Sequence, residues 1–130
     1  ASEGKDICIF GDPNLSRDVI YVKDVAHAFY LAMKSEQTYG LYNMTSGKGV
    51  TLQEQAEVIR DLWAPSENQK SKITYKPEIV NNTPSYLFSM EKAKYDFGFV
   101  PEYADFRTMM TDYKKDLDRN KYQELFNYVK

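Results

Sequence analysis

The sequence is organised around residues 7–43, which begin with Ile7-Cys8-Ile9-Phe10-Gly11-Asp12 and continue, after a short polar loop, with Arg17-Asp18-Val19-Ile20-Tyr21-Val22-Lys23-Asp24. The next segment, Val25-Ala26-His27-Ala28-Phe29-Tyr30-Leu31-Ala32-Met33, has apolar residues at nearly every angle around a helical axis. A helix of this kind has to be covered on most sides. Because 130 residues provide few elements that could cover it, we expect a larger partner layer outside this sequence.

Length and composition indicate a single globular domain. A chain of 130 residues can bury roughly two thirds of its unfolded surface, and an aromatic share of 15% is typical of a folded core. The 17 basic and 19 acidic residues nearly cancel, so we expect no nucleic-acid partner and no anionic membrane partner. The single Cys8 lies in an apolar run and favours a buried thiol in a reducing cytoplasm. No apolar run approaches the roughly 18 residues of a membrane span.

Local patterns predict an α/β chain of short strands and helices. Thr51 and Glu54 form a capping box that starts a helix, and Asp24 is a suitable N-cap for the apolar helix. Gly98 is a suitable C′ residue. We predict strands at 7–10, 19–22, 40–44, 73–77 and 86–88, and helices at 24–34, 52–63, 90–97, 104–117 and 121–129.

Three motifs suggest chemistry but have simpler interpretations. Tyr30 and Lys34 have the Tyr-x-x-x-Lys spacing of nicotinamide enzymes, yet an aromatic residue and a helix-terminal lysine fit this apolar helix better. The Gly47-Lys48-Gly49 turn lacks the third glycine and the downstream acid of a dinucleotide fingerprint, which favours a plain turn. His27 has no metal or triad partners by spacing, so we expect it to mark a narrow exposed strip of its helix.

Arg17 is the strongest candidate for binding. An arginine that opens an apolar strand after a polar loop can bind a phosphate bidentately at the end of a sheet. The alternative is a salt bridge to Asp12, Asp18 or Asp24. The residues alone do not separate these two interpretations.

Four linked motifs resemble one family. They are Phe10-Gly11-Asp12, then residues 17–26, then Gly40-Leu41-Tyr42-Asn43-Met44-Thr45-Ser46-Gly47, then Ser89-Met90-Glu91-Lys92-Ala93 with Phe97-Gly98-Phe99-Val100-Pro101. In order and spacing they resemble the carboxyl-terminal part of the NAD-dependent nucleotide-sugar epimerases and dehydratases, within the extended short-chain dehydrogenase/reductase family. The resemblance spans about residues 7–115.

The resemblance implies roles for single residues. Arg17 matches the arginine that contacts the diphosphate of the nucleotide sugar, and Phe10 matches a position beside the nucleobase. The family often has a second diphosphate arginine followed by a Gly-Asp pair. Ile79 stands at that arginine position, and Asn82 stands at the acid, where it could still hydrogen-bond a ribose or base. Ser89 replaces an Asp that the family usually has.

We therefore predict that residues 1–130 are the substrate-binding domain of a truncated epimerase or dehydratase similar to UDP-glucose 4-epimerase. The resemblance implies an α/β fold with most of the Rossmann core missing, so that NAD, the catalytic Tyr and Lys, and most dimer contacts of a homodimeric parent belong to the absent half. The fragment alone should be inactive. The alternatives are a standalone non-catalytic binding or interaction module, and a reductase or decarboxylase of the same family.

Overall fold

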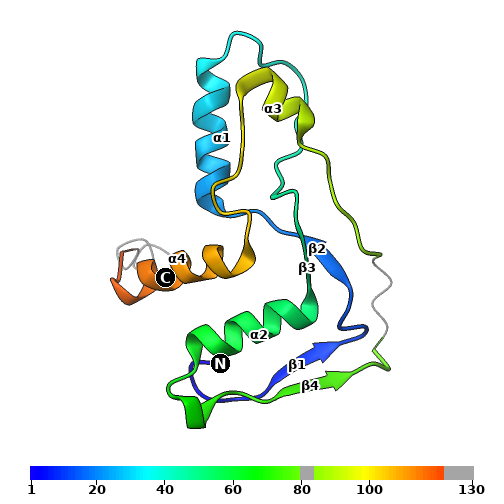
Figure 1. Ribbon diagram of the computed structural model, residues 1–130, viewed down its shortest axis with the longest axis vertical. Helices are drawn as coiled ribbons and strands as arrows, with labels where there is room; N and C mark the ends of the chain where they lie inside the picture. Colours follow the sequence, from blue (N-terminus) through cyan, green and yellow to red (C-terminus); the bar gives the residue numbers. More distant parts are fainter. Residues whose placement is uncertain (80–83, 122–130) are drawn as a thin grey trace, which may run out of the picture.

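The computed structural model describes residues 1–79 and 84–121. Within these ranges the α/β class is confirmed. The elements are β1 (Ile7–Phe10), β2 (Ser16–Asp18), α1 (Val22–Lys34), β3 (Gly49–Thr51), α2 (Leu52–Trp63), a 3-10 turn (Glu67–Gln69), β4 (Ile73–Lys76), α3 (Glu91–Phe97) and α4 (Phe106–Asp118). Figure 1 shows α1 and α3 side by side at one end of the molecule, and β1, β4 and α2 at the other.

The described strands form two separate pairs. β1 and β4 are parallel, with Ile7 opposite Ile73 and Phe10 opposite Lys76. β2 and β3 are antiparallel, with Arg17 opposite Val50. α2 follows β3 directly and packs against β1 and α4. The predicted strands at 7–10 and 73–77 are therefore confirmed.

The start of α1 differs from the prediction. The helix begins at Val22, and Tyr21 occupies the N-cap position without a side-chain hydrogen bond, so the interpretation of Asp24 as N-cap is wrong. Asp24 is buried and accepts hydrogen bonds from the backbone N–H groups of Glu102 (2.8 Å) and Tyr103 (3.1 Å). The Asp24 carboxylate, in the first turn of the helix, thus binds a loop that is distant in sequence. Rules for helix capping consider only neighbouring residues and do not predict this contact.

One face of α1 is buried and the rest is exposed. Ala28 lies in a core cluster with Ala93, Phe97 and Phe99. The opposite side exposes apolar side chains, including Met33, which is 80% exposed. The predicted narrow polar strip at His27 is thus wrong, because the exposed face is wide and largely apolar. Its large members are Val22, Phe29, Tyr30 and Met33.

The two predicted helix signals at Thr51 and Gly98 are confirmed. The Thr51 hydroxyl accepts from the Glu54 N–H (3.1 Å), and the Glu54 carboxylate accepts from the Thr51 N–H (2.8 Å). Gly98 ends α3 with a φ of 71°, a left-handed conformation that glycine adopts without steric cost. Both signals need only neighbours within a few residues, which is why the sequence reveals them.

The charged stretch of α4 is only in part a solvated helix face. The Tyr21 hydroxyl donates to Asp112 (2.9 Å), and the Lys23 ammonium pairs with both Asp112 and Asp116. Asp116 is buried, and Lys121 also pairs with it. This network fastens the start of α1 to α4. The predicted helix at 121–129 lies outside the described residues apart from Lys121, which is in a turn.

Three predicted strands are wrong. The strand expected at 19–22 lies earlier, at Ser16–Asp18, and residues 40–44 and 86–88 are not paired as strands in the described chain. Side chains hold the last two segments instead. The Tyr42 hydroxyl donates to Asp96 (2.7 Å), and the Phe88 N–H donates to the Asp18 carboxylate (3.2 Å). Apolar and aromatic composition alone does not reveal this form of attachment.

Candidate functional site

Arg17 lies in β2, where backbone carbonyls and an aromatic ring contact its guanidinium. Its Nη1 donates to the backbone carbonyls of Ser16 (3.0 Å) and Pro84 (3.2 Å). Its Cζ lies 5.5 Å from the centroid of the Tyr86 ring, within cation–π range. These carbonyls and the aromatic ring help to orient the guanidinium. A guanidinium held in a defined orientation is suited to bidentate binding of an anion.

Asp18 fixes the segment that supports Arg17. Its carboxylate accepts hydrogen bonds from the Thr45 hydroxyl, from the Ser46 N–H (3.1 Å) and hydroxyl (3.0 Å), and from the Phe88 N–H (3.2 Å). Burial by itself would raise the pKa of Asp18. The hydrogen bonds from Thr45, Phe88 and Ser46 outweigh burial and hold the pKa below the ordinary value of 3.8. Asp18 therefore ties β2 to two distant segments as a stable anion.

Asp12 and Asp24, two of the acids considered as salt-bridge partners of Arg17, make hydrogen bonds to other groups. Asp12 accepts from the backbone and side-chain N–H groups of Asn14 (2.9 and 3.1 Å), and Asp24 accepts from the loop before α4. Asp12, Asp18 and Asp24 thus each accept hydrogen bonds that stabilise the fold.

Phe10 ends β1 at the carboxyl edge of the β1–β4 pair. It is 49% exposed, and the Lys76 ammonium lies 5.7 Å from its ring centroid. Gly11 follows with a φ of 76° and donates its N–H to the Lys76 carbonyl (3.0 Å). The chain can turn away from the sheet here because glycine adopts this left-handed conformation readily. An exposed aromatic ring and a lysine thus share this edge.

The other two positions that the resemblance singles out, Ile79 and Asn82, follow β4 in the sequence. Asn82 is outside the described residues. Ile79 is described and half-exposed, and its N–H donates to the Lys76 carbonyl (3.2 Å) in the turn after β4. A surface depression of about 310 Å³ is lined by residues flanking Arg17 and its support, namely Ser16, Gly49, Ser85, Tyr86 and Leu87.

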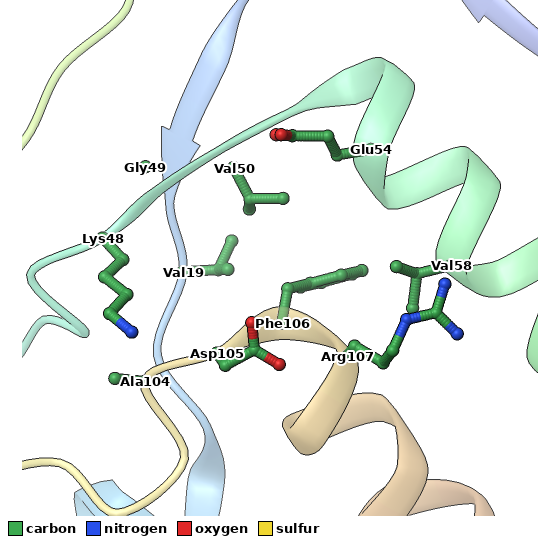
Figure 2. Close-up of a pocket in the computed structure, with 10 residues that line it drawn as sticks. All are labelled: Val19, Lys48, Gly49, Val50, Glu54, Val58, Ala104, Asp105, Phe106 and Arg107. Carbon is green, nitrogen blue, oxygen red and sulfur yellow. The ribbon is translucent and has the colours of Figure 1, made fainter.

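A second cleft, of about 300 Å³, lies between β3, α2 and the start of α4 (Figure 2). Val19, Val50 and Phe106 contribute apolar surface, and Lys48 and Asp105 contribute opposite charges at its rim. Asp105 also caps α4 by accepting from the Thr108 N–H (2.9 Å). Neither Phe10 nor Arg17 lines this cleft.

The glycine turn before α2 does not fit a dinucleotide. A Cβ on Gly49 would lie 2.3 Å from the Ser16 hydroxyl oxygen, so this glycine permits the close pairing of β2 and β3. The N–H groups at the start of α2 are also engaged, since Leu52 and Gln53 donate to the carbonyls of Leu15 (3.1 Å) and Pro13 (3.0 Å). The chain thus turns at Gly47, whereas Gly49 already belongs to β3, and we assign no NAD chemistry to these residues.

Tyr30 and Lys34 are adjacent, but the ammonium lies over the ring face. The Lys34 Nζ is 4.4 Å from the Tyr30 ring centroid, and the His27 ring lies 6.5 Å away. This geometry is that of a cation–π pair on an exposed helix face. In the described chain no group of three or more His, Cys, Asp or Glu residues could hold a metal ion, and no helix there is long and apolar enough to cross a membrane.

Sequence reasoning did not identify Asp18, Tyr86 and Lys76 as parts of the site. Asp18 was considered only as a salt-bridge partner for Arg17, and Tyr86 only as part of a strand. For Lys76 a signal was available, since it is the last residue of an apolar and aromatic strand that is followed by Pro77. The contacts that these residues make span 66 to 70 positions in sequence, beyond the reach of local patterns.

Known proteins resemble this chain in sequence and in structure. Residues 1–45 match the model of the NAD dependent epimerase/dehydratase family. UDP-glucose 4-epimerase of Halalkalibacterium halodurans is 31% identical over 116 residues, which is 80% of this chain and 33% of that protein. dTDP-4-dehydro-6-deoxyglucose reductase of Escherichia coli is 27% identical over 95 residues, which is 73% of this chain and 29% of that protein.

The fold itself has a clear counterpart among solved structures. An epimerase from Methanothermobacter thermautotrophicus superimposes with a TM-score of 0.78 and 21% identity, covering 98% of this chain and 36% of the solved chain. The described architecture is thus that of one part of an extended short-chain dehydrogenase/reductase. The chain belongs to the NAD-dependent epimerase/dehydratase family. It spans about a third of the length of the curated relatives that it matches.

Proposed function

We propose that this chain is the substrate-binding part of an NAD-dependent epimerase or dehydratase that acts on a nucleotide-diphosphate sugar, in the manner of UDP-glucose 4-epimerase. The observation that carries the proposal is the setting of Arg17, whose charge is oriented by two carbonyls and the Tyr86 ring. A fixed guanidinium can bind diphosphate oxygens bidentately. Phe10 lies beside the nucleobase, and Asn82 hydrogen-bonds the ribose or base.

The part of the molecule that binds the nucleotide supports chemistry at the sugar. Binding energy from a non-reacting portion of a substrate can hold the reacting carbon in position. In the whole enzyme, bound NAD would accept and return a hydride on the sugar. The residues described here bind and orient, and we assign catalysis and cofactor binding to the Rossmann half. The isolated fragment is accordingly inactive, and the parent is a cytoplasmic homodimer.

The exposed side of α1 is the surface against which the Rossmann half packs. Phe29 and Met33, which are 64% and 80% exposed, would then become buried. An apolar helix face of this kind is stable in water only when something covers it. The relatives that the chain matches are about three times longer, which leaves room for such a layer.

Substitution of Arg17 tests the binding role. Arg17→Ala should weaken binding of UDP roughly tenfold or more and raise the Michaelis constant of the full enzyme similarly, because a charged hydrogen bond contributes about 1.5 to 3 kcal/mol. Titration calorimetry with UDP measures the effect, and circular dichroism verifies the fold. Arg17→Lys keeps the charge but loses the fork, so it should recover binding only in part.

The control is Arg119→Ala, which removes an exposed arginine at the end of α4. It should leave UDP binding unchanged. Equal UDP affinity of the wild-type chain and Arg17→Ala would remove Arg17 from the site.

The enzyme hypothesis and the alternative of a standalone binding module predict different lengths for the natural protein. Blotting of source cells with an antibody against this segment separates the two. A band at more than twice 15.1 kDa supports the enzyme, and a band at that mass supports the module. The reductase relative keeps reduction open within the enzyme class, and product analysis with the full chain distinguishes reduction from epimerisation.

A further inference from the structure

The carboxyl edge of the β1–β4 pair carries a lysine that the proposed function does not use. In sheets of parallel strands, ligands bind beyond the carboxyl ends of the strands. Phe10 and Lys76 are the last residues of β1 and β4, and they lie opposite each other in the register. A ligand beyond this edge therefore meets both side chains.

Lys76 carries its charge at this edge without an acidic partner in the described chain. Its ammonium lies 5.7 Å from the Phe10 ring centroid, and no ion pair joins it to a carboxylate among residues 1–79 and 84–121. The neighbouring Asp12 is engaged by Asn14. An aromatic ring holds a cation in place but leaves its charge available to a ligand.

The start of α2 holds the Lys76 edge and the Arg17 strand together. Gln53 donates its N–H to the Pro13 carbonyl (3.0 Å) in the loop between β1 and β2, and its side-chain oxygen accepts from the Tyr75 hydroxyl (2.9 Å) in β4. A loop of residues 11–15 can span at most roughly 20 Å. Figure 1 shows the carboxyl ends of β1 and β4 on the same side as the start of β2.

Charge matching indicates what Lys76 would bind. The diphosphate of a nucleotide sugar carries two negative charges, and Arg17 provides one positive charge. Ile79, at the position where a second arginine would be expected, has an apolar side chain. Its N–H donates to the Lys76 carbonyl, so both residues belong to the same turn after β4.

We propose that Lys76 contacts the diphosphate of the bound nucleotide and supplies the second positive charge of the site. This inference rests on the proposed nucleotide-sugar function and adds a specificity residue to it. Lys76 selects nucleoside diphosphates over nucleosides, while Arg17 anchors the same group from β2. Because Lys is a compact point charge, Arg can replace it with little loss at an exposed edge.

The test compares UDP with uridine as probes, using titration calorimetry on the 130-residue chain. Lys76→Gln should weaken UDP binding roughly fivefold, as expected for a partly solvated charge pair. The same substitution should leave uridine binding unchanged, and Lys76→Arg should recover UDP binding to within about twofold. Raising the salt concentration should weaken UDP binding less in Lys76→Gln than in the wild type. Lys72→Gln, at an exposed lysine just before β4, is the matched control and should leave the affinities for UDP and for uridine unchanged.

The outcomes separate this inference from the proposed function. UDP binding that depends on Arg17 but is unchanged in Lys76→Gln overturns the role of Lys76 and leaves the proposed function standing. Equal weakening of UDP and uridine in Lys76→Gln also overturns it, because the lysine would then act on the nucleoside or on folding. Absence of UDP binding by the wild-type chain overturns both.

Discussion

At the level of single residues, Asp18 determines how the segment from Pro84 to Phe88 lies beside β2. The carboxylate receives the Phe88 N–H, while the Ser16 N–H donates to the Ser85 hydroxyl (2.9 Å). Arg17 lies between these two attachments and reaches the Pro84 carbonyl. The orientation of Arg17 therefore depends on its neighbour in sequence as well as on its own contacts.

Substitution of Asp18 should reveal this contribution through its pH dependence. Asp18→Asn should lower the free energy of unfolding at pH 7 by about 1 to 2 kcal/mol, because charge-assisted hydrogen bonds are lost. The folded pKa of Asp18 lies below the ordinary 3.8, so its stabilisation is complete above that pH. The stabilisation disappears as the pH falls through the folded pKa. The difference between variant and wild type should narrow there.

Urea unfolding of both proteins at pH 7 and at pH 3 measures this difference. Asp12→Asn is the control, since the exposed Asp12 carboxylate accepts hydrogen bonds from the nearby Asn14, two residues along the chain. A gap between Asp18→Asn and wild type that is equal at both pH values would show that the carboxylate charge is not the cause.

At the level of elements, the first turn of α1 is fastened to the rest of the chain by Asp24, Lys23 and Tyr21. Asp24 receives two N–H groups from the loop before α4, and Lys23 and Tyr21 bind Asp112 in α4. The helix itself has no side-chain N-cap. Its position is therefore set by tertiary contacts more than by its own capping.

Asp24→Ala should destabilise the chain more than a lost helix cap would. The substitution leaves the N–H groups of Glu102 and Tyr103 without this partner in a buried place, which costs about 3 kcal/mol or more, against about 1 kcal/mol for a typical cap. Asp24→Asn, with one carbonyl oxygen, should lie between wild type and Asp24→Ala. Thermal unfolding followed by circular dichroism ranks the three proteins. A loss of only about 1 kcal/mol in Asp24→Ala would indicate that Asp24 acts merely as a cap.

At the level of the whole molecule, the two ends differ in how much of the apolar surface of their helices is exposed. One end, with β1, β4 and α2, has its helix packed on its strands (Figure 1). At the other end, α1 packs against α3 on one side and exposes large apolar side chains on the opposite side. Exposed apolar patches of this kind favour association.

The isolated chain should therefore self-associate through α1. The double variant Phe29→Glu with Met33→Glu should shift the chain toward monomer at a given concentration, because charges on this face oppose its burial. Analytical ultracentrifugation of both proteins measures the change. Ile79→Glu alters a comparably exposed apolar residue after β4 and should leave the association constant unchanged. Equal association of the double variant and the wild type would place the contact elsewhere.

Prediction from sequence succeeded for elements with local signals and failed where distant contacts decide. Thr51 with Glu54 and Gly98 were identified correctly, since each makes its hydrogen bonds within a few residues. Arg17 was identified as a candidate because an arginine at this place can bind a phosphate bidentately and because it matches the diphosphate arginine of the family, but the groups that support it were not identified. Pro84 and Tyr86 reach it across a separation of 67 to 69 residues.

Local patterns in the sequence predict the α/β class and the helix boundaries at Thr51 and Gly98, because periodicity and capping chemistry depend on neighbours along the chain. The order of four motifs over about residues 7–115 adds the resemblance to the epimerase family. The three-dimensional contacts were needed to show that Asp24 accepts hydrogen bonds from the loop before α4, that residues 86–88 are held by Asp18, and that Lys76 lies beside Phe10. The physical reason is that these side chains satisfy their charges and hydrogen bonds with groups far away in sequence, where no local pattern records the partner.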